Sequence, residues 1–256
     1  MTNQSALVIA HPGHELRVHH WMETQQPLVL VLTDGSGRSA RSRMKSTARV
    51  VEEAGALLGS IRGRFTDSSI YSMLLNNRYE PLVDTATEIA NILMEQGIDT
   101  VACDAREGYN PGHDVCGYLV QFAVRRARAF VPTIAWYEFS LINKPDELPA
   151  DKRNQSICLT LDKEAFNRKL EAAQNYPELQ KEFEIAVQNF GIEGFAVEIL
   201  QRASFQIPDG DPFLTTSPYY EEYGLRQVSA NLYPSVIRYR DHLRPLQNLL
   251  YEMSEM

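Results

Sequence analysis

The stretch Ala-Leu-Val-Ile-Ala-His-Pro-Gly-His-Glu, residues 6–15, decides how the rest of the chain is interpreted. It begins with a short, uninterrupted apolar run, which is typical of a strand buried on both faces of a parallel sheet. The run ends in His11 and His14, which share one face if the second histidine begins a helix. Imidazole is the commonest protein ligand for zinc, and ligands gather beyond the carboxyl ends of strands in open α/β sheets. The stretch therefore predicts half of a metal site, with two histidines that only cap a turn as the alternative.

Predicted strands and helices alternate along most of the chain. Apolar runs predict strands at residues 6–10, 27–33, 61–65, 99–104, 130–139 and 157–162. Helical spacing predicts helices at residues 16–23, 46–59, 82–94, 113–128, 162–175 and 178–189. This alternation predicts an α/β fold with a Rossmann-like, doubly wound and mostly parallel sheet. The first strand is followed by no G-x-G-x-x-G motif and the chain has no P-loop motif, so the sequence does not support nucleotide binding of those kinds.

We expect a single α/β domain over residues 1–256, because this length can bury one full core and no change in composition marks a boundary. A C-terminal extension at about 205–256 is expected to pack on the domain, since it is too aromatic for a disordered tail. The Pro-, Asp- and Gly-rich composition of residues 207–218 predicts a loop near the site. Within the helix predicted at 46–59, Leu57 and Leu58 are expected on the apolar side, while His19 and His20 are expected at the surface.

The composition excludes several classes of partner. A formal net charge of −8 argues against a surface that neutralises phosphate backbones, so we expect no nucleic acid partner. The three cysteines, Cys103, Cys116 and Cys158, form no C-x-x-C pair, which suits a reducing compartment. The N-terminus lacks a basic region, and no apolar run reaches membrane-spanning length. We therefore expect a cytoplasmic protein without a membrane partner, and leave homo-oligomer formation open.

A second loop, at residues 105–114, contains Asn110-Pro111-Gly112-His113. Together, Ala-His-Pro-Gly-His-Glu and Asn-Pro-Gly-His resemble the motifs A-H-P-D-D-E and H-x-D-H of the zinc-dependent N-acetylglucosaminyl deacetylases, often called the PIG-L or LmbE family. Weaker similarities at residues 32–35, 54–55, 65–67 and 168–173 extend the resemblance to about residue 190. The resemblance implies the fold of that family and a zinc-dependent hydrolase.

The resemblance also implies roles for individual residues. Carried over by position, the zinc ligands are His11, His14 and His113, with His14 in place of an aspartate of the family motif. Three histidines suit a catalytic zinc ion with an open fourth position. A neutral imidazole in place of a carboxylate leaves the ion more positive, which should lower the pKa of a water that it binds.

Four further residues are implied to act on the substrate. Arg43 and Asp67 would contact it, with a surface arginine and a turn aspartate as the alternatives. Tyr109 and Asn110 would stabilise an oxyanion through a hydroxyl and an amide N–H group.

The sequence departs from the family motif at the general base. The family aspartate with that role is replaced by Gly13, and Gly112 and Asn110 replace two residues of the second motif. We expect another carboxylate to do this work, with Glu107 first, Asp104 next, and Asp34 and Glu15 after them. Glu107 is preferred because its glycine-containing loop could bring it within hydrogen-bond reach of a metal-activated water. A solvated loop charge is the alternative for Glu107.

The leading functional hypothesis is a zinc-dependent deacetylase or amidase that uses metal-activated water on a small N-acyl molecule similar to an amino sugar. The loss of both family aspartates, at Gly13 and Gly112, motivates a second hypothesis, a catalytically silent relative that binds a sugar-like ligand or a partner protein. A third hypothesis is a Rossmann-like sugar-nucleotide transferase, which predicts nucleotide binding without metal. It would leave the loop that carries His113 without a role.

Overall fold

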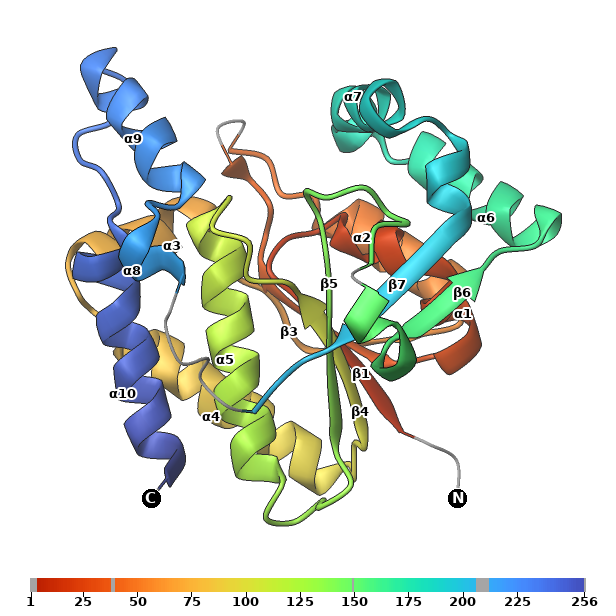
Figure 1. Ribbon diagram of the computed structural model, residues 1–256, viewed down its shortest axis with the longest axis horizontal. Helices are drawn as coiled ribbons and strands as arrows, with labels where there is room; N and C mark the ends of the chain where they lie inside the picture. The colour runs from red at the N-terminus through yellow and green to blue at the C-terminus, as the bar shows by residue number, and fades with distance from the viewer. Residues whose placement is uncertain (1–3, 38–39, 149, 206–211, 256) are drawn as a thin grey trace.

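The computed structural model of the 256-residue chain describes residues 4–37, 40–148, 150–205 and 212–255. These residues contain the strands β1 (Ser5–Ile9), β2 (Leu28–Thr33), β3 (Leu57–Phe65), β4 (Thr100–Asp104), β5 (Ala135–Phe139), β6 (Ile157–Thr160) and β7 (Val197–Arg202). Within the described residues the seven strands form one sheet in the order β3-β2-β1-β4-β5-β7-β6 (Figure 1). The first five in this order are parallel, and β7 runs antiparallel to both β5 and β6. The predicted α/β fold with a mostly parallel sheet is confirmed.

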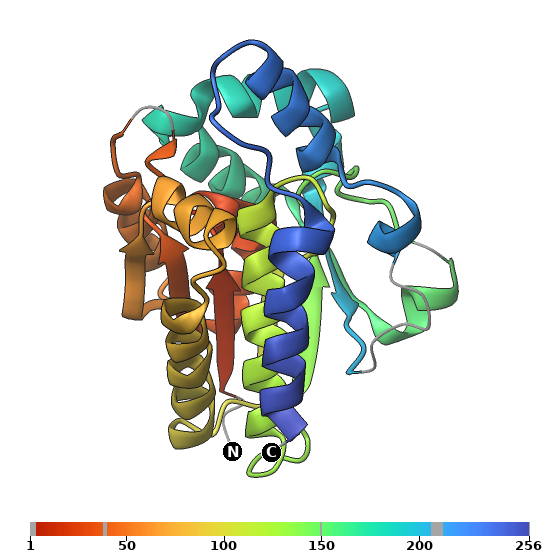
Figure 2. The same ribbon diagram turned by 90° about the vertical axis from the view of Figure 1, so that its left-hand side faces the viewer.

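Helices cover both faces of the sheet (Figures 1 and 2). One face carries α1 (His19–Gln25), α2 (Met44–Glu53) and α6 (Lys163–Gln174); the other carries α3 (Asp67–Leu75), α4 (Glu80–Glu95), α5 (Pro111–Ala127) and α10 (Arg244–Glu255). Successive side chains of a strand point to opposite faces. Accordingly, Ala6 and Val8 of β1 belong to one core cluster, whereas Leu7 and Ile9 belong to the other. Every residue of β1 is buried, as a strand between two helical layers requires.

The remaining elements lie around the sheet. They are the short helices η1 (His14–Val18), η3 (Ala150–Gln155), η4 (Pro177–Leu179), η5 (Glu193–Ala196), η6 (Tyr239–Leu243) and α8 (Pro212–Thr215), and the longer helices α7 (Gln180–Phe190) and α9 (Tyr219–Ser229). Figure 1 shows α7 and α9 above the sheet on opposite sides, and Figure 2 shows the same separation in depth. None of the helices in the described part of the chain combines the length and apolarity needed to cross a bilayer.

The helix predicted at 46–59 is shorter than expected, and the prediction of its C-terminal end is wrong. It stops at Glu53, and Gly55 adopts a left-handed conformation with φ of 72°, which ends a helix at low cost. Leu57 and Leu58 therefore belong to β3 and not to the apolar side of α2. The surface position expected for His19 is also wrong, because its side chain is buried.

Strand β7 and the helices α3, α8, α9 and α10 were not predicted, and one strand begins later than expected. Helix α3 begins where the Thr66 side chain accepts a hydrogen bond from the Ser69 amide, and β7 joins the sheet as an antiparallel strand. The strand predicted at 130–139 begins only at Ala135, because the chain still turns after α5, where the Phe130 amide bonds to the Ala127 carbonyl.

The C-terminal segment contributes to the core. Tyr239, Leu243, Leu246 and Leu250 are buried in the cluster that also contains the apolar faces of α4 and α5. Of the loop predicted at 207–218, residues 207–211 lie outside the described residues, and α8 begins at 212. In the loop between β2 and α2, residues 38–39 also lie outside them.

A buried ion pair joins β7 to α6, and hydrogen bonds from the same carboxylate extend the contact to α1. Lys169 Nζ lies 2.9 Å from Glu198 Oε1, and both side chains are almost completely buried. The Glu198 carboxylate also accepts hydrogen bonds from the backbone amides of His20 and Trp21, at 2.9 and 2.8 Å. Burial lowers the pKa of Lys169, an effect that Glu198 opposes. Glu198 therefore keeps a buried ammonium group charged and fixes where α6 sits.

The substitution Glu198→Gln should lower the free energy of unfolding by about 3 kcal/mol, because it leaves a buried Lys169 ammonium without its counter-charge. Urea unfolding followed by circular dichroism measures this change. The double variant Glu198→Gln/Lys169→Met should recover most of the loss, since it removes the uncompensated charge. A single variant as stable as the natural sequence would contradict this role for the pair.

Candidate active site

Three histidine side chains meet above the carboxyl ends of β1 and β4. His11 follows β1, His14 begins η1, and His113 lies in the first turn of α5. The ring centroids are 5.2 Å apart for His11 and His14, 5.1 Å for His11 and His113, and 4.7 Å for His14 and His113. The structure thus brings together all three residues that the motifs suggested as metal ligands.

Local sequence explains how His113 enters this group. Asn110 is the N-cap of α5, and its side chain accepts a hydrogen bond from the Gly112 amide at 2.7 Å. Pro111 follows at the first helical position, which its fixed φ angle suits. The Asn-Pro-Gly-His sequence therefore starts a helix and places His113 in its first turn.

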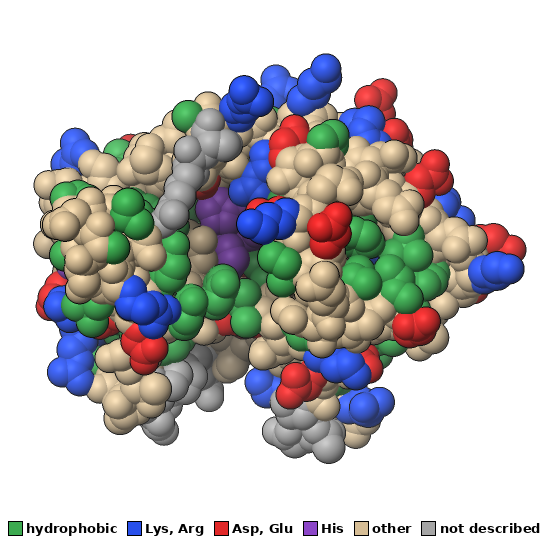
Figure 3. All heavy atoms as spheres, turned by 90° about the horizontal axis from the view of Figure 1, so that it is seen from above, with side chains coloured by type: hydrophobic (Ala, Val, Ile, Leu, Met, Phe, Trp, Pro, Cys, Tyr) green, Lys and Arg blue, Asp and Glu red, His purple; other side chains and the backbone are tan. Residues whose placement is uncertain are grey.

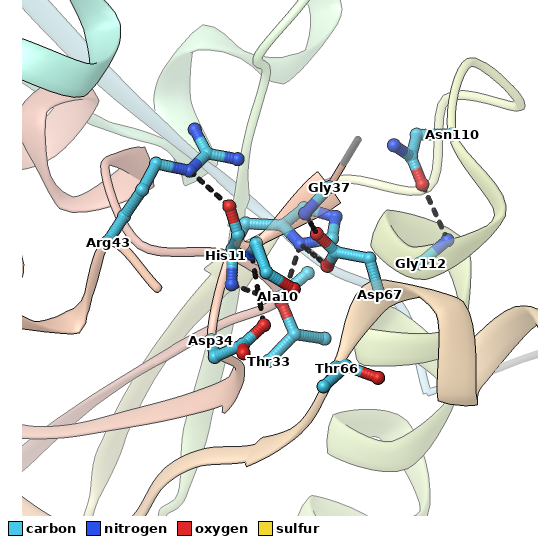
Figure 4. Close-up of polar contacts among 12 residues, drawn as sticks. Ala10, His11, Thr33, Asp34, Gly37, Arg43, Thr66, Asp67, Asn110 and Gly112 are labelled. Carbon is cyan, nitrogen blue, oxygen red and sulfur yellow. Dashed lines mark hydrogen bonds and ion pairs between the residues drawn. The ribbon is translucent and has the colours of Figure 1, made fainter. Parts of the chain in front are cut away.

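Two carboxylates hold two of the imidazole rings. His11 Nδ1 lies 2.8 Å from Thr33 Oγ1 and 2.9 Å from Asp67 Oδ1, and Figure 4 shows Asp67 pointing at the His11 ring. His14 Nδ1 lies 2.8 Å from Asp104 Oδ2. A proton held on Nδ1 leaves Nε2 with its lone pair, which is the common arrangement around metal-binding histidines.

The charges of these groups follow from burial and from their partners. Burial, and then the neighbouring histidines, lowers the pKa of both His14 and His113 well below the usual value, so both rings are neutral at pH 7. Burial raises the pKa of Asp104 to about 7. Burial alone would also raise the pKa of Asp67, but its contacts with His11 and its hydrogen bond with the Gly37 amide hold that pKa well below the usual range. Neutral imidazole is the form that binds a metal ion.

The histidine group can be compared with what a metal ion requires. The described residues contain no group of three or more His, Cys, Asp or Glu side chains whose donor atoms are positioned to hold a metal ion. Judged on ring positions, the three histidines match one closely, because Zn–N bonds of about 2.0–2.1 Å in a tetrahedron would place imidazole centroids roughly 5 Å apart. His11 Nε2 and His113 Nδ1 are buried and have no hydrogen-bond partner among the described residues. The spacing of the rings therefore suits a metal ion, whereas the donor atoms as they stand form no coordinating group among the described residues.

A pocket of about 670 Å³ opens above the histidines. Viewed from above the sheet, histidine side chains lie at the bottom of a hollow bordered by hydrophobic side chains (Figure 3). This volume is within the range of small-molecule sites, which is roughly 300–1,000 Å³. The polar part of the lining includes His11, His14, His113, Arg43, Asp67, Tyr71, Tyr109 and Asn110.

The residues expected to contact substrate all line this pocket. Arg43 donates from Nε to the Gly35 carbonyl at 2.6 Å (Figure 4), and Asn110 Oδ1 accepts a bond from the Tyr71 hydroxyl at 3.4 Å. Tyr109 is 43% exposed and stacks on Tyr219 with ring centroids 4.9 Å apart.

The carboxylates first considered as bases have other partners. Glu107 accepts hydrogen bonds from Ser140 Oγ at 2.5 Å and from the Leu141 amide at 3.0 Å, and it is not among the described residues that line the pocket. Asp104 is completely buried and likewise does not line it. Asp34 accepts a bond from the Ser36 amide (Figure 4 shows Asp34), and Glu15 accepts bonds from the Gly13 amide and the Thr47 hydroxyl.

Helices α6, η4 and α7 supply pocket residues that the motifs did not indicate. From these elements Lys169, Leu170, Leu179, Glu182 and Phe183 line the pocket. Glu182 and Phe183 lie three and four residues after Leu179, a spacing that places all three on one side of a helix. This spacing was visible in the sequence, but nothing in the sequence indicated that this side faces the histidines.

The space beside Gly13 is filled by Leu179. A Cβ atom on Gly13 would lie 2.2 Å from Leu179 Cδ1, and Gly13 has a φ of 105°, which only glycine adopts readily. Gly112 is similarly confined, because a Cβ atom there would lie 3.1 Å from His11 Nε2. Both glycines stand at positions that are aspartates in the motifs quoted above, and a side chain at Gly13 would require both a strained backbone and a shift of Leu179.

No protein-family model and no curated protein matches the sequence. Solved structures do match it in fold. The zinc-inhibited form of teicoplanin deacetylase Orf2 has a TM-score of 0.55 at 15% sequence identity, over 81% of this chain and 100% of that chain. This chain shares the fold of that structure. A triple mutant of the same deacetylase gives the same values, and a deacetylase–bog complex from the teicoplanin pathway has a TM-score of 0.50 at 14% identity, with the same coverage. The resemblance to PIG-L and LmbE deacetylases is confirmed for the fold.

The substitution Gly13→Ala should destabilise the protein by more than the about 1–3 kcal/mol that a strained left-handed residue costs, because Leu179 must also move. Gly97→Ala is the matched control, since Gly97 has a φ of 61° and no atom within 4 Å of an added Cβ. Thermal and urea unfolding of both variants measure the difference. Equal losses of stability would show that Leu179 does not fill the space beside Gly13.

Proposed function

We propose that the protein is a zinc-dependent amide hydrolase that acts on a small N-acyl molecule. The observation that carries the proposal is the convergence of three histidine rings at the bottom of a pocket, two of them held by carboxylates. The likeness in fold to a deacetylase solved in a zinc-inhibited form supports the same reading.

The histidines and their partners would hold the metal ion. His11, His14 and His113 would be the ligands, which the buried and unpartnered His11 Nε2 and His113 Nδ1 support. Asp67 and Asp104 would fix the orientation and tautomer of the His11 and His14 rings. When bound, zinc would supply a positive charge that polarises an amide carbonyl and lowers the pKa of water.

Polar groups on the α3 and α5 side would bind the substrate. The hydroxyl of Tyr71 and the side chain of Asn110 lie together at the pocket wall, and the guanidinium of Arg43 enters from the start of α2. These groups offer N–H and O–H donors to a carbonyl oxygen or to sugar hydroxyls. Tyr109, on the exposed side, would contact the part of the substrate farther from the histidines.

We assign proton transfer to Glu182 in place of Glu107. Glu182 lines the pocket one helical turn beyond Leu179, the residue that fills the space beside Gly13. No described residue forms a hydrogen bond or ion pair with its carboxylate, whereas Asp67 and Glu107 are both engaged. A carboxylate that is accessible from the pocket can accept a proton from water and pass it to a leaving amine.

The second candidate function is a catalytically silent protein that binds an N-acyl or sugar-like ligand at the same pocket. The contact between Leu179 and the space beside Gly13 favours it, because this packing removes the place of the family's general base. Both functions predict metal and ligand binding, but only the hydrolase predicts turnover of a substrate.

Purified protein should contain about one zinc ion per chain, and His113→Ala should abolish stoichiometric binding, because a three-histidine site cannot lose one ligand without losing most of its affinity. Elemental analysis after dialysis measures the zinc content. His20→Ala is the control, since His20 bonds to Glu23 outside the pocket. Natural protein that holds no zinc or comparable divalent ion after incubation would refute the proposed site.

The substitution Glu182→Gln should lower kcat for N-acetylglucosamine and related N-acyl amines by about 10²–10⁴-fold, the usual contribution of a general base, with zinc content unchanged. Glu184→Gln, on the same helix but absent from the pocket lining, should keep full activity. Release of the free amine provides the assay. A fully active Glu182→Gln variant would reject this assignment, and zinc-loaded natural protein without turnover of any N-acyl amine would favour the silent function.

A further inference from the structure

The pocket has an apolar arm on the side away from Tyr71 and Asn110. We define this arm by Ile142, Leu170, Phe183, Ala186, Phe190 and Phe195, which come from the loop after β5, α6, α7 and η5. The arm is continuous with the space above the histidines, because all these residues line the same pocket. A ligand bound at the histidines therefore has an apolar wall on one side and polar donors on the other.

Helix α7 supports this arm as a binding surface. None of its eleven residues is buried, although Phe183, Ala186 and Phe190 recur at the spacing of one helical face. These three side chains are half-buried and line the pocket instead of packing into either core cluster. An amphipathic helix whose apolar face lines a pocket is stabilised when an apolar group covers that face and removes it from water.

The cationic groups near the arm have partners already. Lys169 donates to Glu198 and to the Arg17 carbonyl, and Arg17 donates to the carbonyls of Ser140 and Asn143. The arm thus offers few unpaired donors to a second sugar or to a phosphate. Its chemistry favours a hydrocarbon group.

The size of the pocket indicates that this group is longer than an acetyl group. The volume of about 670 Å³ includes the arm, the polar wall and the space above the histidines. A two-carbon acetyl group would fill a small part of this volume. A medium-length acyl chain, together with a sugar-sized head group, would fill most of it.

We propose that the arm binds the acyl chain of the substrate, and that the preferred substrates are N-acyl amines whose acyl chains are longer than acetyl. The inference rests on the proposed function. The amide would lie at the histidines, its amine side towards Tyr71 and Asn110 and its acyl side towards α7. Hydrolysis would break the C–N bond, add the hydroxyl group of water to the carbonyl carbon and transfer a proton to the amine, giving a fatty acid and a free amine.

The test uses N-alkylsulfonyl glucosamines with ethyl, butyl, hexyl and octyl chains, which cannot be hydrolysed as amides, at concentrations below those at which they aggregate. Calorimetry on the zinc-loaded protein should show the Kd tightening by up to roughly fourfold per methylene, and at least about tenfold from ethyl to hexyl. Phe183→Ser should flatten this dependence. Ala186→Phe, which fills the arm without removing packing, should weaken octyl binding and spare ethyl binding.

Ile185→Ser is the matched control, because Ile185 is 46% exposed on the same helix and does not line the pocket. It should keep the full chain-length dependence. Affinity that does not change with chain length, or an unchanged dependence in both arm variants, would overturn the proposal. Tighter binding of octyl N-acetylglucosaminide than of the N-octylsulfonyl compound would also overturn it, by placing the chain on the sugar side.

Calorimetry with these compounds, together with the amine-release assay on N-acyl amines, separates this inference from the proposed function. Chain-length-dependent binding without any amide turnover would support the arm and refute the hydrolase. Turnover of N-acetyl substrates with no gain for longer acyl chains would support the hydrolase and refute the arm.

Discussion

One carboxylate oxygen, Asp104 Oδ2, ties the site to the sheet. It accepts a hydrogen bond from the Ala10 amide at 2.8 Å and lies 2.8 Å from His14 Nδ1. The first contact joins the end of β4 to the end of β1, and the second orients an imidazole ring. Because β1 is buried on both faces, its end cannot shift without disturbing both core clusters. The position of the His14 ring is therefore fixed relative to the centre of the sheet.

The second constraint comes from the glycines near the histidines. Gly13 brings the backbone close to Leu179, and Gly112 lies close to the His11 ring, so a larger residue at either position would require a neighbouring side chain to shift. In the resembling motifs, aspartates stand at these positions. With glycine there, the surroundings of the histidines are less acidic. Among the described residues that line the pocket, Glu182 on α7 is the carboxylate without a hydrogen bond or ion pair, and the proposed chemistry builds on it.

The elements after β5 give the pocket its particular character. The buried pair of Lys169 and Glu198 fixes α6 against β7, and η4 then delivers Leu179 and α7 above the sheet. On the opposite side, α9 brings Tyr219 against Tyr109. A common deacetylase-like sheet thus carries a pocket with one apolar wall and one polar, aromatic wall.

Residues 6–15 by themselves determined a buried strand ending in two histidines, and helical spacing determined a helix beside a third. The fold class could be predicted because short-range spacing marks strands and helices that alternate along the chain, whereas the meeting of the three histidines was predicted only from the resemblance to the family motifs. The end of α2, the antiparallel strand β7 and the burial of His19 were missed, because they depend on how distant segments pack. Only the tertiary structure turned Glu107 towards Ser140, placed Leu179 beside Gly13 and brought Glu182 and Phe183 to the pocket. Contacts between residues that are distant in the sequence leave no periodic signal in either segment, since they are selected by the packing of the whole domain.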